Sequence, residues 1–248
     1  MEETMNDTLR ALVDLRDRTL QKSRIQFGNR ISAVENGKDT VNGETLEVLT
    51  RWNMRFDELE QMADKDISRF VCDVPIVQQM TCVKGIGKLL AAKVVAMVDI
   101  TRADTVSALW RYAGYGVVEG ARERPTKGEK LHYNARLKTT CYLIGSSFLR
   151  SGSPYRSVYD AAREYYEKNR PDWTKGHQHN AAMRKMIKAF LAHLWERWRQ
   201  LEGLPTRELY AMEQMGHTHY MRAEEFGWPE IAGNSKEPNG VERAGLGE

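Results

Sequence analysis

The sequence predicts an all-α protein in which a long helical hairpin precedes a compact helical domain. Over most of the 248 residues, apolar side chains recur at intervals of three and four, as they do along one face of a helix. Alternating apolar and polar runs of the kind that form strands are nearly absent. At most a short β-hairpin is expected, near residues 114–132. Apolar residues make up 41% of the chain, which is enough to bury a core.

Residues 1–72 are expected to form two long helices joined by a short loop. Residues 7–34 contain mostly strong helix formers and no proline, and the Asn-Gly pairs at 36–37 and 42–43 favour turns. A heptad seam then runs along residues 44–70, formed by Leu49, Trp52, Phe56, Leu59, Ala63, Ile67 and Phe70. The two helices can fold back on each other, or pair as a coiled coil with the same hairpin of a second subunit. The second arrangement predicts a homo-oligomer formed through residues 9–70.

A compact domain is expected over residues 73–229. Its first helix begins with Asp73 as N-cap and Pro75 in the first turn, where a missing N–H costs nothing. Further helices are expected after Gly87 and near residues 133–150, 154–169 and 177–202. We interpret the apolar face of the last helix as core and not as a base-stacking surface: Met183, Ile187, Phe190, Leu194, Trp198 and Leu201. Residues 230–248 have almost nothing to bury and are expected to be a disordered tail.

Charge is distributed unevenly along the chain. The net charge is only +3, yet residues 84–201 hold 22 Lys and Arg against 10 Asp and Glu, so the flanks are acidic. A basic block on an acidic chain predicts a polyanionic partner, because neutralised phosphates release their counterions. A solvated basic surface is the alternative. The densest basic run, which we expect to grip a phosphate strand, contains Arg122, Arg124, Lys127, Lys130, Arg136 and Lys138.

The most informative segment is the turn within residues 83–92, which read VKGIGKLLAA. Glycines permit positive φ angles and a close approach of the backbone, and the apolar residue between them can tuck between two helices. The helix that follows starts with unpaired N–H groups and the positive end of its dipole, which together attract phosphate. Such contacts hold DNA without reading bases. A tight helix–helix turn without a ligand is the alternative. The expected DNA contacts are Lys84, Gly85, Ile86, Gly87, Lys88 and Lys93.

This hydrophobic-x-Gly-hydrophobic-Gly pattern, followed by two alanines, resembles the helix-hairpin-helix elements of Holliday-junction proteins, repair glycosylases and several recombinases. The order of features over residues 9–200 also resembles the C-terminal part of the Piv-type transposases and DNA invertases, which are insertion-sequence recombinases guided by a bridge RNA. The matching segments are residues 15–37, the turn, Val98-Asp99-Ile100, Leu109 with Tyr112-Ala113-Gly114, Asn134 with Leu137-Lys138, and Leu194-Trp195. The resemblance implies a role in DNA recombination.

Two features of that family are not found. Its RuvC-like domain, with four metal-binding acids, would precede the helical hairpin, and its nucleophilic serine would follow Gly114. No serine occurs between Ser107 and Ser146, and Glu119 cannot replace a serine that bonds covalently to DNA. We therefore assign no catalytic residue, metal or cofactor. The His-x-His pairs at 177–179 and 217–219 are interpreted as surface histidines, because neither has further ligands at metal-binding spacing.

These observations predict a protein that grips the backbone of duplex or branched DNA and is related to recombinases. One alternative is an active recombinase that works with a separately encoded nuclease domain and a structured RNA. Another is a structural protein that assembles through its heptads. The chain has no apolar run of membrane-spanning length and no apolar signal sequence, and three scattered cysteines do not make a disulfide framework, so a cytoplasmic location is expected.

Overall fold

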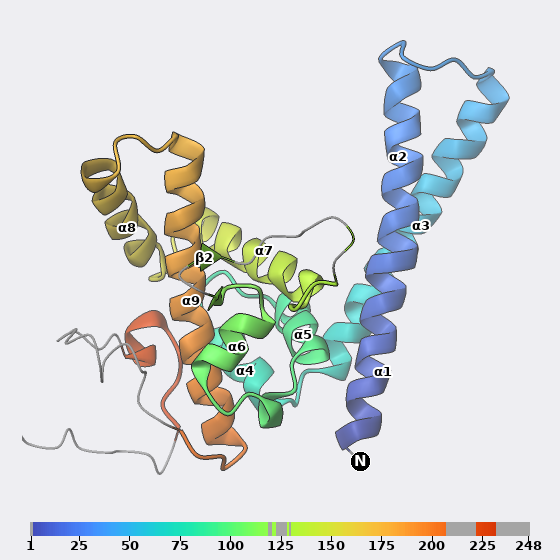
Figure 1. The fold of residues 1–248 in the computed structure, drawn as a ribbon. Helices are drawn as coiled ribbons and strands as arrows, with labels where there is room; N and C mark the ends of the chain where they lie inside the picture. The colour runs from blue at the N-terminus through green and yellow to red at the C-terminus, as the bar shows by residue number, and fades with distance from the viewer. Residues whose placement is uncertain (1, 119–120, 123–127, 129, 207–221, 232–248) are drawn as a thin grey trace, which may run out of the picture.

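A computed structural model of the chain describes residues 2–118, 121–122, 128, 130–206 and 222–231. In these parts the protein is helical, which confirms the predicted class. The expected hairpin near residues 114–132 contains two short antiparallel strands, β1 (Val117–Val118) and β2 (Ala121–Arg122). An arm formed by residues 2–70, a pair of long helices, projects from a compact body that contains the other described helices (Figure 1).

The arm is a helical hairpin that folds back within one chain. Its first helix is continuous through α1 (Glu2–Asp14), a π-helical segment (Leu15–Leu20) and α2 (Gln21–Glu35). The second helix, α3 (Gly43–Phe70), returns along it (Figure 1). Asn42 caps α3, because its Oδ1 accepts a hydrogen bond of 2.8 Å from the N–H of Thr45. The two expected helices are therefore present, and a π-helical segment interrupts the first one.

The predicted heptad seam of α3 is divided between two faces. Phe56 packs against Phe27 of α2, with ring centroids 5.5 Å apart, and Ile67 is fully buried. Trp52 and Leu59, however, are 51% and 44% exposed. Polar residues occupy part of the inner face instead: Glu60 is buried and accepts hydrogen bonds from Arg24 and Gln21 of α2. The expectation that all seven residues form one seam was therefore wrong.

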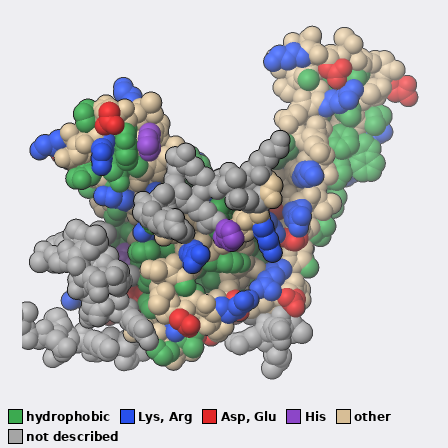
Figure 2. All heavy atoms as spheres, viewed as in Figure 1, with side chains coloured by type: hydrophobic (Ala, Val, Ile, Leu, Met, Phe, Trp, Pro, Cys, Tyr) green, Lys and Arg blue, Asp and Glu red, His purple; other side chains and the backbone are tan. Residues whose placement is uncertain are grey.

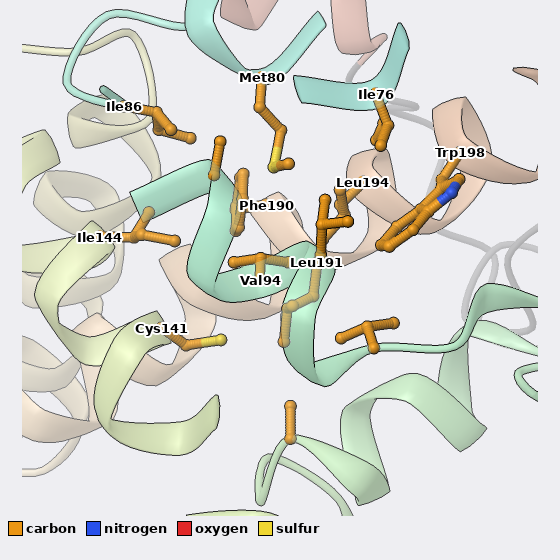
Figure 3. Close-up of a cluster of buried hydrophobic side chains, with 14 of the residues drawn as sticks. Ile76, Met80, Ile86, Val94, Cys141, Ile144, Phe190, Leu191, Leu194 and Trp198 are labelled. Carbon is orange, nitrogen blue, oxygen red and sulfur yellow. The ribbon is translucent and has the colours of Figure 1, made fainter. Parts of the chain in front are cut away.

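The body is built around one long helix, α9 (Lys175–Leu201). Its apolar face lies in the core, as predicted, and Phe190, Leu194 and Trp198 are buried there beside α4 and α5 (Figure 3). The other described elements of the body are α4 (Pro75–Cys82), α5 (Lys88–Met97), a 3-10 turn (Ile100–Arg102), α6 (Val106–Tyr112), α7 (Ala135–Ser151), α8 (Arg156–Asn169) and a second 3-10 turn (Ala223–Phe226).

The base of the arm shares this core. Leu9 and Val13 of α1 and Ile67 of α3 belong to the same cluster of buried side chains as α5 and α9. The arm is thus anchored by packing, although residues 1–72 are a separate region of the sequence. In the part of the chain that the structure describes, no helix is both long and apolar enough to cross a membrane. The expected tail at 230–248 lies, after residue 231, outside the described residues.

Candidate nucleic-acid interface

The turn between α4 and α5 depends on a glycine at one position. Gly85 has a φ of +102°, and a hydrogen bond of 3.0 Å from the N–H of Ile86 to the carbonyl of Val83 closes the turn. Ile86 is buried between the helices, as predicted from the sequence, so the DNA contact that was also expected of its side chain was wrong. A Cβ on Gly85 would lie 2.7 Å from Ser151 Oγ, so a side chain there would meet α7. Glycine is required at 85 by both backbone conformation and space.

The turn is also fixed to α7 by a hydrogen bond. Ser147 Oγ donates to the carbonyl oxygen of Gly85 over 2.7 Å. Gly85 therefore faces protein, and the expectation that it lets a phosphate approach the backbone was wrong. Its role is to let the turn pack closely on α7.

Gly87 occupies the open side of the turn. Its φ is −94°, so it does not use the positive φ that the sequence suggested, and it is exposed. Among the described residues, no heavy atom lies within 4 Å of a Cβ built there. Gly87 is the N-cap of α5 and has no side chain that could accept hydrogen bonds from the N–H groups of the first turn. These donors and the positive helix end can therefore bind an anion.

Basic side chains surround this helix start. Lys84 and Lys88 are exposed on the two sides of Gly87, as expected. Arg150 adds a cation that the sequence did not indicate. It is exposed on α7 three residues after Ser147, on the side of α7 that faces the turn. Helix geometry places Arg150 on the side of the turn only because Ser147 contacts Gly85, which is 62 residues away in the sequence.

Lys93 does not belong to this site. Its side chain is only 8% exposed, and its Nζ lies 2.7 Å from Oδ1 of Asp17 in the arm. Five residues separate Lys93 from Lys88, which places them about 140° apart around the helix axis. Lys93 therefore faces the arm while Lys88 faces solvent, and the expected DNA contact of Lys93 was wrong.

The second basic run is only partly described. Arg124 and Lys127, and the side chain of Arg122, lie outside the described residues, whereas Lys130 is exposed. Arg136 forms an ion pair with Asp14 of α1, and the Nζ of Lys138 lies 4.3 Å from the centroid of the Tyr133 ring.

The two predicted contact regions lie at different places along α7. Arg136 precedes Ser147 by eleven residues, so the two lie on the same side of α7, roughly 16 Å apart. The turn and the described part of the basic run therefore lie in two separate places and do not form one patch. Figure 2 shows a hollow between the arm and the end of α8 and α9, with Lys and Arg side chains on the surface beside it.

Two of the segments that carry the recombinase resemblance, Tyr112-Ala113-Gly114 and Asn134 with Leu137-Lys138, meet where α6 ends and α7 begins. Asn134 Nδ2 donates to the hydroxyl of Tyr112 over 3.0 Å, and the N–H of Asn134 donates to the Tyr112 carbonyl over 2.8 Å. Gly114 has a φ of +75°, and a Cβ there would lie 2.9 Å from Cδ of Lys138. Tyr115 Oη donates to the Lys138 carbonyl over 3.3 Å, and burial raises the pKa of Tyr115. This junction fixes the start of the β1–β2 hairpin.

The His-x-His pairs give no metal site in the described residues. His177 stacks on Trp173, with ring centroids 4.0 Å apart, and His179 Nδ1 lies 2.7 Å from the hydroxyl of Tyr159. No group of three or more His, Cys, Asp or Glu side chains in the described part of the chain could hold a metal ion. His217 and His219 lie outside the described residues.

Comparisons of the chain with protein-family models, with curated proteins and with solved structures gave no match.

Proposed function

We propose that the protein binds the phosphate backbone of duplex or branched DNA through a helix-hairpin-helix formed by α4, its turn and α5. The observation that carries the proposal is the exposed, uncapped start of α5 at Gly87, between Lys84 and Lys88. Backbone N–H groups and a helix dipole bind phosphate without selecting a base, so the predicted binding is independent of sequence.

A second group of basic side chains, near the other end of α7, supports the proposal. Lys130 is exposed there, and Arg136 and Lys138 are partly exposed. A strand held at both places would contact two phosphate groups roughly 16 Å apart, the distance along α7 from Ser147 to Arg136. We propose that Arg122, Arg124 and Lys127 contribute to this grip.

The relationship to Piv-type recombinases remains part of the proposal. It is supported by the meeting of the Tyr112-Ala113-Gly114 segment with Asn134 and Lys138 at one junction. We propose a DNA-binding role without a catalytic centre in this chain, because the serine that the family uses is not found after Gly114. Strand transfer by the purified chain would contradict this.

We also propose that the protein self-associates through the exposed face of α3. Val48, Trp52, Leu59 and Met62 follow one another at steps that keep them on one side of the helix, and they are 36% to 58% exposed. Since a twofold axis presents the same stripe twice, a second copy can cover it. This observation favours the coiled-coil alternative raised by the heptad spacing.

One substitution tests the DNA site without damaging the fold. Aspartate is a favourable N-cap residue, and no heavy atom of the described residues lies within 4 Å of a Cβ built at Gly87. The Gly87→Asp variant should therefore fold as wild type does. Its carboxylate would accept hydrogen bonds from the free N–H groups of the first turn and would repel phosphate. We expect at least about tenfold weaker binding to duplex and four-way-junction DNA in fluorescence anisotropy, as for loss of one charged contact.

The matched control is Asn42→Asp, which makes the same charge change at the N-cap of α3, at the far end of the arm. This variant should bind DNA as wild type does. A folded Gly87→Asp variant with unchanged affinity across a salt titration would refute the helix-hairpin-helix assignment.

A further inference from the structure

Four aromatic rings form a continuous chain at the end of the α8–α9 pair. Tyr165 meets Tyr166 edge to face at 5.4 Å, and Tyr166 stacks on Trp173 at 5.3 Å. Trp173 in turn stacks on His177 at 4.0 Å, with only 5° between the ring planes. The rings come from two helices and the segment between them. His177, the ring on α9, is exposed, whereas the stripe of α9 that forms the core is buried.

Two cations accompany these rings. Lys185 Nζ lies 5.0 Å from the ring centroid of Tyr165 and 5.2 Å from that of Tyr166. The guanidinium of Arg170 lies 5.6 Å from the Trp173 ring. Both cations are exposed, and so is Tyr165, at 53%. Figure 2 shows hydrophobic, basic, acidic and histidine side chains at this end of the molecule.

Packing against the rest of the protein explains the positions of some of these rings, but it does not explain why Tyr165 is exposed. The stack of Trp173 on His177 closes the connection between α8 and α9, so these two rings have a structural role. Tyr165 lies at the open end of the chain and leaves half of its surface in water, next to a lysine that neutralises negative charge. An exposed ring beside cations is the arrangement that proteins use to stack a nucleic-acid base and hold the adjacent phosphate.

We propose that the Tyr165–His177 ring chain, with Lys185 and Arg170, is a stacking site for unpaired bases of a single-stranded nucleic acid. One base stacks on Tyr165, and the cations contact the phosphates that flank it. Carboxylates of Glu164, Glu167 and Asp172 are also exposed nearby, although Glu167 is paired with Arg163 at 2.6 Å. The site therefore depends on stacking more than on net charge, and its affinity should fall less steeply with salt than duplex binding does.

This inference goes beyond the proposed function, because it concerns another surface and another form of nucleic acid. It does not require the α4–α5 turn to bind anything. A duplex cannot use the site, since its bases are already stacked and paired. An unpaired loop of RNA and a displaced strand of DNA present the same ring faces, so the test includes both.

The experiment compares Tyr165→Ala with wild type by fluorescence anisotropy, using labelled oligo(dT), oligo(U) and a duplex. Loss of one stacking ring should weaken binding to a single strand roughly tenfold and leave duplex binding unchanged. Tyr165→Trp should restore the affinity, because tryptophan also stacks, whereas a merely structural role would not predict this rescue. If only one oligonucleotide shows the effect, the site takes that nucleic acid.

Tyr142→Ala is the control, since Tyr142 is a tyrosine of similar exposure on α7. If Tyr165→Ala does not fold, Lys185→Gln replaces it: this exposed substitution removes the charge beside both tyrosines and should also weaken single-strand binding. The inference is overturned if wild type does not bind either single strand, or if a folded variant binds both as tightly as wild type. Failure of Gly87→Asp to affect duplex binding bears only on the α4–α5 turn.

Discussion

Lys93 Nζ lies 2.7 Å from Asp17 Oδ1, and this ion pair joins α5 of the body to the π-helical segment of the arm. Arg16, the neighbour of Asp17, pairs at 2.7 Å with both Glu60 and Asp64 of α3. The Lys93, Arg16 and Glu60 side chains are each less than 10% exposed. The arm is therefore held at its base by a buried charge network in addition to apolar packing.

Asp17→Ala should destabilise the protein more than Lys93→Met does. Removing Asp17 leaves the ammonium of Lys93 buried without this partner, which costs about 3 kcal/mol. After Lys93→Met, Asp17 keeps its ion pair with Arg16 at 3.0 Å, and methionine fills the space, so we expect about 1 kcal/mol. The free energy of unfolding in urea measures both.

The exposed pair of Arg55 and Glu58 provides the control, since Arg55→Ala should change stability by less than about 0.5 kcal/mol. Equal losses for Asp17→Ala and Lys93→Met would show that the network does not depend on Asp17. DNA affinity should be unchanged in a folded Lys93→Met variant, because Lys93 does not face the turn.

Gly85→Ala and Gly87→Ala should differ strongly in stability. At 85 the backbone has a positive φ and a Cβ would lie 2.7 Å from Ser151 Oγ, so strain and crowding together should cost about 3 kcal/mol. At 87 the φ is ordinary and the side chain points into open space, so alanine should cost about 1 kcal/mol at most. Thermal unfolding of the two variants measures the difference. Similar melting temperatures would contradict the geometry of the turn.

Local spacing predicted the helices, because apolar periodicity and turn residues act within a few positions of the chain. It also predicted that Ile86 is buried and that α9 turns its apolar face to the core. Contacts between distant residues were not predictable in the same way. Glu60 of α3 accepts hydrogen bonds from α2 and takes a place in the inner face that apolar spacing had assigned to Leu59. Nothing in the sequence pairs Lys93 with Asp17.

The candidate nucleic-acid sites show the same difference between features that are local in the sequence and contacts between distant residues. The sequence identified the helix start at Gly87 and its flanking lysines, since these are adjacent in the chain. It missed Arg150 and the ring chain at Tyr165, because both depend on how helices far apart in sequence pack. The sequence had favoured core over base stacking for the aromatic residues of the last helix, which was correct for that stripe. The exposed rings lie mostly on α8 and in the connection to α9.

Tyr155→Phe should destabilise the protein and change its response to alkaline pH. The Tyr155 hydroxyl accepts a hydrogen bond of 2.8 Å from Trp228 Nε1 and lies 2.6 Å from His193 Nδ1, all within the core. Phenylalanine would remove this shared partner, at a cost of about 1–3 kcal/mol. Tyr165→Phe, at an exposed position, is the control and should have no effect on stability.

The pH dependence follows from burial, which raises the pKa of Tyr155 well above its ordinary value. The folded protein therefore holds this proton more tightly than the unfolded chain does. The resulting contribution is fully present below the unfolded pKa, about 10, and is lost as the pH rises above it. Urea unfolding at a series of pH values should show stability falling above about pH 10 in wild type, and falling less in Tyr155→Phe. Identical pH profiles would mean that Tyr155 does not contribute to this loss.

Self-association should depend on the exposed apolar face of α3, which includes Trp52 and Leu59, and not on α3 as a whole. Trp52→Glu combined with Leu59→Glu places two charges in the apolar stripe, where a second copy would have to desolvate them. Sedimentation velocity should then show a monomer where wild type shows a dimer or larger species. Thr50→Glu with Gln61→Glu adds the same charge to the opposite side of the helix, about 160° to 180° away from Trp52 and Leu59, and should remain associated. Because neither pair alters a buried side chain, the folds should be equally stable. A monomeric wild type at all concentrations would refute the proposed self-association, and the exposed stripe would then need a different partner.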